Sequence, residues 1–144
     1  PIGSIFQVVH EAAMTQQSTT WQIHGFSDPV GKGFPKMTQV VLSPSQGEIL
    51  PVIIKLKSLL ASKGSTTYVY NELPSDHPLN QRLNGEVPGE TFAPLAATQN
   101  VQGSYSRSIQ ASFVHIELES QVRLSANSRE KMARAIAAAV QIGS

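Results

Sequence analysis

The sequence predicts an α/β fold with a three-layer arrangement, in which a mostly parallel or mixed sheet carries helices on both faces. Short β-branched and aromatic runs alternate along the chain with stretches of helical periodicity. The chain has 144 residues, 40% of them hydrophobic, which is enough for one core but short for two. No internal repeat or low-complexity segment interrupts this pattern. We therefore expect residues 1–144 to form a single α/β domain.

Strands are expected where β-branched, aromatic and other apolar residues are bounded by turn-forming residues. They fall at 20–26, 38–43, 66–70, 95–101 and 112–118. The segment 27–35 contains two prolines and two glycines, which predicts a loop after the first strand.

Helices are expected where apolar residues recur at a period of 3.6. The first begins after Ser4, which with Gln7 forms a capping box, and a second covers residues 48–63. Asn127, with Glu130 three positions later, is expected to cap the last helix.

Residues 71–94 contain four prolines and two glycines, which excludes long regular elements, although 78–83 could form a helical turn or two. A segment this long is often functional, and one hypothesis is that it forms a lid over a site, with Gly85 and Gly89 as hinges. The alternative is an ordered connection across the sheet.

Charge and composition exclude several classes of protein. The net charge is only +1 and most of the basic residues are scattered, so nucleic acid is not an expected partner. The chain has no cysteine, which excludes disulfides and thiolate metal ligands. No apolar run is long enough to span a bilayer.

Two strands carry the candidate functional residues. The stretch TWQIHGF places His24 at the end of a strand, where ligands of α/β proteins collect. In FVHIELE, strand alternation puts His115, Glu117 and Glu119 on one face, with apolar residues on the other. Because a buried charge must be paired or ligated, Glu117 is the more informative residue.

Structural roles are also open for these residues. His24 could be a hydrogen-bonded residue at a strand end, and His115 could be a packing or supporting residue. Glu117 could pair with Arg107 or Arg123 at the edge of the sheet.

Four stretches together resemble a known family. They are Gly3-Ser4-Ile5-Phe6, then QIHGF, then residues 98–107 (TQNVQGSYSR), then FVHIELE. In this order they resemble bacterial proteins with the zinc-carboxypeptidase-like fold, related to N-formylglutamate amidohydrolases and aminoacylase-type hydrolases.

The resemblance implies a zinc-dependent hydrolase of a peptide or N-acyl amino-acid bond. It implies that His24 is a zinc ligand and that Glu117 is the catalytic general base. It places Asn100 and Arg107 where substrate carboxylate or carbonyl groups are held, and His115 in a supporting position. The expected substrate is a small molecule or peptide, and the expected location is periplasmic or secreted, with a cytoplasmic one left open.

The sequence departs from this family in one respect, because it contains no H-x-x-E motif to supply two further zinc ligands. One explanation is that the chain is the C-terminal part of a longer hydrolase domain, with the motif in an upstream segment. The other is a non-catalytic binding or interaction domain that keeps the fold without the metal site.

Overall fold

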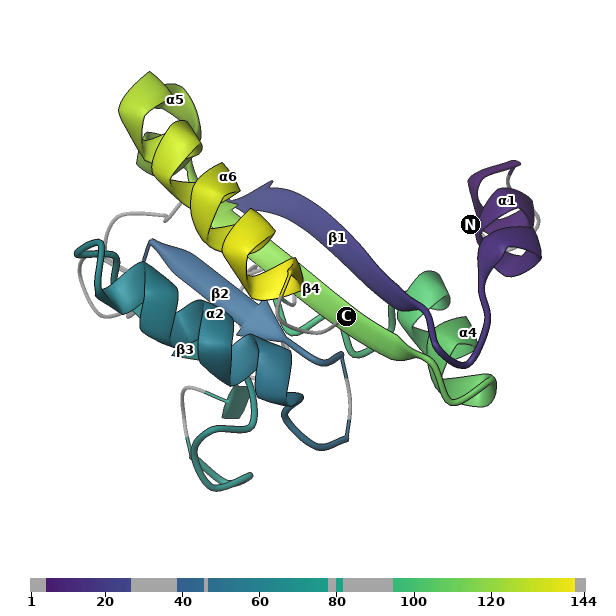
Figure 1. The fold of residues 1–144 in the computed structure, drawn as a ribbon. Helices are drawn as coiled ribbons and strands as arrows, with labels where there is room; N and C mark the ends of the chain where they lie inside the picture. The colour runs from purple at the N-terminus through teal and green to yellow at the C-terminus, as the bar shows by residue number, and fades with distance from the viewer. Residues whose placement is uncertain (1–4, 27–38, 46, 78–79, 82–94, 142–144) are drawn as a thin grey trace.

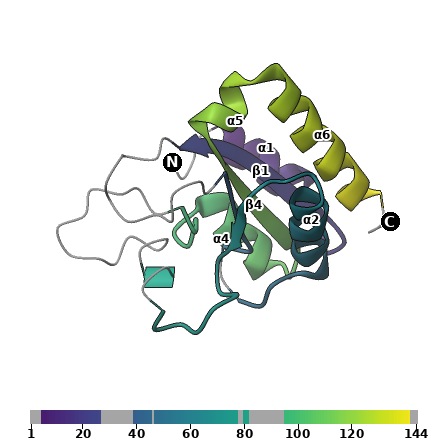
Figure 2. The same cartoon turned by 90° about the vertical axis from the view of Figure 1, so that its left-hand side faces the viewer.

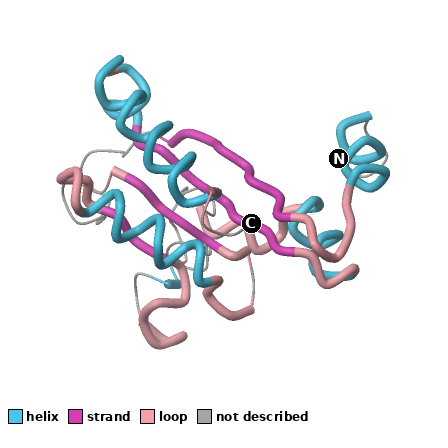
Figure 3. Tube along the Cα trace, viewed as in Figure 1, coloured by secondary structure: helices cyan, strands magenta, loops and turns pink. Residues whose placement is uncertain are grey.

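The structure is a computed structural model, and it describes residues 5–26, 39–45, 47–77, 80–81 and 95–141. Its strands are β1 (Thr19–Phe26), β2 (Val40–Ser43), β3 (Thr67–Val69) and β4 (Ser112–Glu119). Its helices are α1 (Ile5–Ala13), α2 (Pro51–Ala61), α4 (Val101–Ser108), α5 (Ser120–Leu124) and α6 (Ala126–Val140). Figure 1 shows their arrangement, and Figure 3 shows the strands lying side by side.

The described strands form one mixed sheet of four strands in the order β1-β4-β2-β3. β1 runs parallel to β4 along its whole length, and β2 runs parallel to β3. β2 and β4 are antiparallel. The α/β class and a mixed sheet, one of the two expected forms, are therefore confirmed.

One face of the sheet carries the main hydrophobic core. Val114, Ile116 and Leu118 of β4 point to this face, together with Val40 and Leu42 of β2. The buried residues Ile53, Leu56 and Leu60 of α2 and Met132, Ala135 and Ala139 of α6 pack against them. Figure 2 shows α2 and α6 on this side of the strands and α4 on the other.

The second face has a smaller core and buried polar groups. Phe26, Val41, Leu95 and Ala96 are buried together there. Segment 95–97 is fixed to β2 and the residues after it, because Ser43 Oγ donates to the Ala96 carbonyl at 2.5 Å and Ser45 Oγ donates to the Ala97 carbonyl at 2.6 Å.

Helix α4 packs on this second face near the start of β4. A Cβ atom added to Gly103 would lie 3.2 Å from the Phe113 ring and 2.8 Å from Ser45 Oγ, so glycine permits the close approach.

The strand expected at 95–101 is wrong. Residues 95–100 form turns, Ala97 has a positive φ of 54°, and α4 begins at Val101. Asn100 decides the local structure, because its side-chain oxygen accepts from the Gly103 amide at 3.0 Å and caps α4. The prediction failed because a short, largely apolar run in the sequence does not by itself distinguish a strand from a buried loop.

The expected cap of the last helix is also corrected. Ser125 Oγ accepts from the Ser128 amide at 3.2 Å, so α6 begins at Ala126 and Asn127 lies inside its first turn. Glu130 instead accepts a hydrogen bond from Arg134 at 2.7 Å. Both residue types suit a first turn, and the serine two positions earlier is the one that caps it.

The other predicted strands and helices of the described residues lie within a few residues of the expected bounds, although the helix expected at 48–63 spans only Pro51–Ala61. Pro51 begins α2, and Gly64 adopts a positive φ of 79° beyond its end. Ser4 lies outside the described residues, as do the hinges Gly85 and Gly89 and most of the proposed lid. Among the described residues, no helix is long and apolar enough to cross a membrane.

Candidate metal centre

The parallel pairing of β1 with β4 brings the three candidate side chains together. His24 lies directly opposite Glu117 in the register of the two strands, and Gln22 lies opposite His115. Because side chains on parallel strands in register share a face, His24, His115 and Glu117 all project from the second face. The apolar residues between them on β4 hold this orientation by packing into the main core.

The ligand atoms of the three side chains are close together. One nitrogen from each histidine and one oxygen of Glu117 all lie within 4.8 Å of one another. His115 Nε2 is 3.5 Å from Glu117 Oε1, and the rings of His24 and His115 have their centroids 5.1 Å apart. We call these three side chains the His24–His115–Glu117 cluster.

Two members of the cluster are buried. His115 and Glu117 are 3% and 7% exposed, whereas His24 is exposed. His115 Nδ1 and Glu117 Oε2 make no hydrogen bond within the described part of the chain. A buried polar atom without a partner is costly, so the cluster does not satisfy all of its own buried polar atoms.

Burial also changes the protonation of the cluster. Burial and, to a smaller extent, the neighbouring His24 lower the pKa of His115 to about 4, against an opposing contribution from the backbone of Leu95. Burial raises the pKa of Glu117 to about 7, and Arg123 opposes this shift. At neutral pH His115 is therefore a neutral imidazole, which is the form that binds metals.

The side chain of Arg123 lies where β1 and β4 end. The sequence suggested this arginine only as a possible partner of Glu117. Its Nε donates to the Leu118 carbonyl at 3.2 Å and its Nη2 donates to the Phe26 carbonyl at 3.1 Å. Gly25 makes room for this guanidinium, because a Cβ atom there would collide with the Arg123 side chain. In the sequence, the glycine next to His24 was the one indication that another group approaches the backbone closely at this position.

Asn100 lies beside β1 but uses its side chain to organise other residues. Its Nδ2 donates to Gln22 Oε1 at 2.7 Å while its oxygen caps α4. Both ends of the amide are thus engaged. The structure places Asn100 next to the strand that carries His24 and gives it hydrogen bonds within the chain.

Arg107 lies nearer the other end of β4. Its Nη1 donates to Ser45 Oγ at 2.8 Å, and burial lowers its pKa. It lines a cavity of about 310 Å³ with residues that include Ser112 and Phe113 at the start of β4. Among the described residues, no hydrogen bond or ion pair joins Arg107 to the cluster.

The fold and the cluster define an α/β protein with a candidate metal centre on one face of a mixed sheet. Comparison of the chain with protein-family models, with characterised proteins and with solved structures finds no match. The resemblance to zinc-carboxypeptidase-like hydrolases therefore remains an expectation from the sequence.

Proposed function

We propose that the protein is a zinc-dependent hydrolase of amide bonds whose metal is held by the His24–His115–Glu117 cluster. The observation that carries the proposal is the convergence of two imidazoles and one carboxylate from neighbouring strands. Two histidines and a glutamate are a ligand set that catalytic zinc sites use, with one position left for water or substrate. The resemblance to amidohydrolases suggests the reaction type. The proposal also includes the zinc-carboxypeptidase-like, three-layer fold that this resemblance implies.

The geometry of the cluster fits a tetrahedral metal. With zinc bonds of about 2.0 to 2.2 Å, two ligand atoms of a tetrahedral site lie about 3.3 to 3.6 Å apart. His115 Nε2 and Glu117 Oε1 already have this spacing, at 3.5 Å. His24 is exposed, so its side chain can move by the small amount that closes the set.

In this proposal the residues at the site have different roles. His115 presents a neutral nitrogen from the core, and Glu117 supplies the negative charge that compensates the metal. Bound zinc would polarise a substrate carbonyl and lower the pKa of a bound water toward about 7. Arg123 lies beyond the same strand ends and provides a fixed positive charge for a substrate carboxylate, a role that the sequence assigned to Arg107.

Zinc titration by calorimetry tests the metal site. We expect one zinc per chain with micromolar or tighter affinity, and a loss of about tenfold or more in each of His24→Ala, His115→Ala and Glu117→Gln. His77→Ala, which changes an exposed histidine outside the cluster, is the matched control and should bind like the unsubstituted chain. Absence of zinc binding, or equal losses in the control, would contradict the proposal.

Amine release from N-acyl amino acids tests the reaction, because these substrates carry the carboxylate that Arg123 would hold. The zinc-loaded chain should release amine, and a chelator should stop it. A chain that binds zinc at the cluster but hydrolyses none of these amides would instead be a non-catalytic binding domain.

The two roles considered for Glu117 are separated by the same variant. If Glu117 is a ligand, as the cluster geometry supports, Glu117→Gln loses zinc affinity. If it is only the general base that the resemblance implies, zinc affinity is kept and turnover alone is lost.

A further inference from the structure

Helix α1 has apolar residues that its own packing leaves uncovered. Val8 and Val9 are 56% and 62% exposed, and Ala13 is exposed as well. The helix is nevertheless fixed to α4 by polar contacts. Tyr105 Oη donates to the Glu11 carbonyl at 3.2 Å, and the His10 ring meets the Tyr105 ring edge-on at 5.7 Å. The apolar residues of α1 are therefore held in place without being buried.

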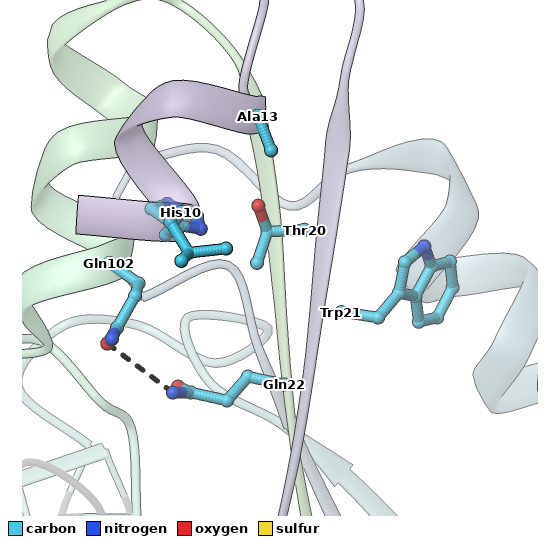
Figure 4. Close-up of a pocket in the computed structure, with 7 residues that line it drawn as sticks. His10, Ala13, Thr20, Trp21, Gln22 and Gln102 are labelled. Carbon is cyan, nitrogen blue, oxygen red and sulfur yellow. Dashed lines mark hydrogen bonds between the residues drawn. The ribbon is translucent and has the colours of Figure 1, made fainter. Parts of the chain in front are cut away.

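A cavity of about 400 Å³ lies between α1, β1 and α4. Its lining is mainly apolar and is made by Val9, His10, Ala13, Thr20, Trp21, Gln22 and Gln102. Figure 4 shows Thr20 and Gln22 pointing from β1 to the side of α1, whereas the Trp21 side chain points away. The volume is within the range of small-molecule sites, about 300 to 1,000 Å³.

A chain of side-chain amides ends at this cavity with a free donor. The Gly103 amide fixes the orientation of Asn100, so Asn100 Nδ2 must donate to Gln22 Oε1. Gln22 Nε2 then donates to Gln102 Oε1, at 3.5 Å (Figure 4). Gln102 Nε2 is left without a hydrogen-bond partner among the described residues. The cavity thus combines apolar walls with one oriented N–H donor.

The cavity adjoins the metal cluster along β1. Thr20, Gln22 and His24 alternate on the same face of the strand, and Gln22 is in register with His115. Neighbouring residues on one face of a strand are about 6.6 Å apart, which is within the reach of one small substrate.

We propose that this cavity binds the apolar acyl chain or side chain of the substrate, with the adjoining carbonyl accepting a hydrogen bond from Gln102 Nε2. The described residues of the lining include no Lys, Arg, Asp or Glu, so they offer a charged group no such counter-charge for the hydration it would lose. The inference names the substrate class of the proposed hydrolase and rests on it for the chemistry. Binding itself uses no side chain of the metal cluster.

The test compares N-hexanoylglycinamide with N-acetylglycinamide on the zinc-free chain, followed by NMR shifts of the Val9 and Ala13 methyl groups. Each buried methylene adds about fourfold to affinity, so the hexanoyl compound should bind at least about tenfold more tightly. Equal affinities of the two compounds would overturn the proposal.

Two variants of α1 localise the binding. Ala13→Trp fills the cavity and should abolish binding of the hexanoyl compound, while Ala12→Trp, at an exposed position of the same helix outside the cavity lining, should leave it unchanged. Gln102→Met removes the donor and should weaken binding about fivefold. Equal effects of the two tryptophan variants would place the ligand elsewhere.

The failure of this inference and the failure of the proposed function are distinguishable. Ala13→Trp should retain the zinc affinity of the unsubstituted chain, because the cavity supplies no metal ligand. Chain-length-dependent binding without any zinc affinity would support the cavity and contradict the hydrolase. Zinc affinity without chain-length dependence would do the reverse. Loss of zinc affinity in Ala13→Trp would contradict the separation of the two sites.

Discussion

His115 and Glu117 lie on the same face of β4, and burial moves their pKa values in opposite directions. A neutral histidine and a protonated carboxyl are the forms that a buried site tolerates without a ligand. In the proposed metal site, zinc would reverse this preference for Glu117, since the metal requires the carboxylate. If the proposed site binds zinc, metal binding would therefore offset the cost of burying these two groups.

The first prediction concerns the metal-free chain and its stability against pH. His115 has a pKa lowered from 6.5 to about 4, so its contribution to stability is lost as pH falls through this range. Glu117 has a pKa raised from 4.5 to about 7, so its contribution is present at low pH and is lost as pH rises. The two effects oppose each other between pH 4.5 and 6.5.

Removing one of the two titrating groups should reveal the effect of the other on the pH dependence of stability. In Glu117→Gln the free energy of unfolding should rise between pH 4.5 and 6.5 by up to about 3 kcal/mol, while the unsubstituted chain stays nearly flat. Urea unfolding at these two pH values, in the presence of a chelator, measures the difference. Parallel pH profiles for the two chains would show that the groups are not coupled to folding in this way.

The second prediction at the residue scale concerns Gly25. In Gly25→Ala the new Cβ must displace the Arg123 side chain, which removes its hydrogen bonds to the Leu118 and Phe26 carbonyls. Because Arg123 holds down the pKa of Glu117, that pKa should rise further in the variant. NMR titration of the Glu117 carboxyl carbon measures it, and an unchanged or lower pKa would contradict the placement of Arg123.

Single residues also show what the sequence could reveal about the site. Strand alternation was enough to put His115 and Glu117 on one face, and the strand end indicated His24. The three side chains come together only because β1 pairs with β4. These strands are far apart in the sequence, so no local sequence pattern predicts that they pair. His115 was assigned a supporting role because a lone histidine carries no information about the strand beside it.

At the scale of elements, α4 connects the fold to both sites. Asn100 caps this helix and orients Gln22, and Gln102 lies in its first turn. The sequence missed α4 because residues 95–101 read as a strand. The capping asparagine was the signal that would have found it, together with Gly103 at its third position.

Two substitutions of Asn100 should separate its roles. Asn100→Ala removes the cap and should destabilise the protein by about 1 kcal/mol. Asn100→Asp keeps the capping oxygen but loses the donor to Gln22, so stability should be nearly retained while binding of N-hexanoylglycinamide falls. Thermal unfolding and the NMR titration measure the two effects, and equal loss of stability in both variants would show that the Gln22 hydrogen bond is structural.

At the scale of the whole molecule, the class of fold was predictable because helical and strand periods alternate clearly along the chain. The strand order was not, since β4 pairs with β1 and β2 rather than with its neighbours in sequence. This order places the main hydrophobic core on one face of the sheet, under α2 and α6, and places the His24–His115–Glu117 cluster on the other.

Zinc should also stabilise the whole domain, because the cluster exists only when β1 and β4 are paired. A zinc concentration one hundred times the dissociation constant should add about 2.7 kcal/mol to the free energy of unfolding. Thermal unfolding with and without zinc measures this, with His24→Ala as the variant that should lose the effect. The same stabilisation in the variant would place the metal elsewhere.

The most direct measurement is a crystal structure of the full chain grown with zinc, in which anomalous scattering at the zinc absorption edge locates the metal. We predict one peak bonded to His24, His115 and Glu117 at about 2.0 to 2.2 Å. A crystal with no peak at these three side chains, or with zinc bound only at other residues, would contradict the proposed metal centre.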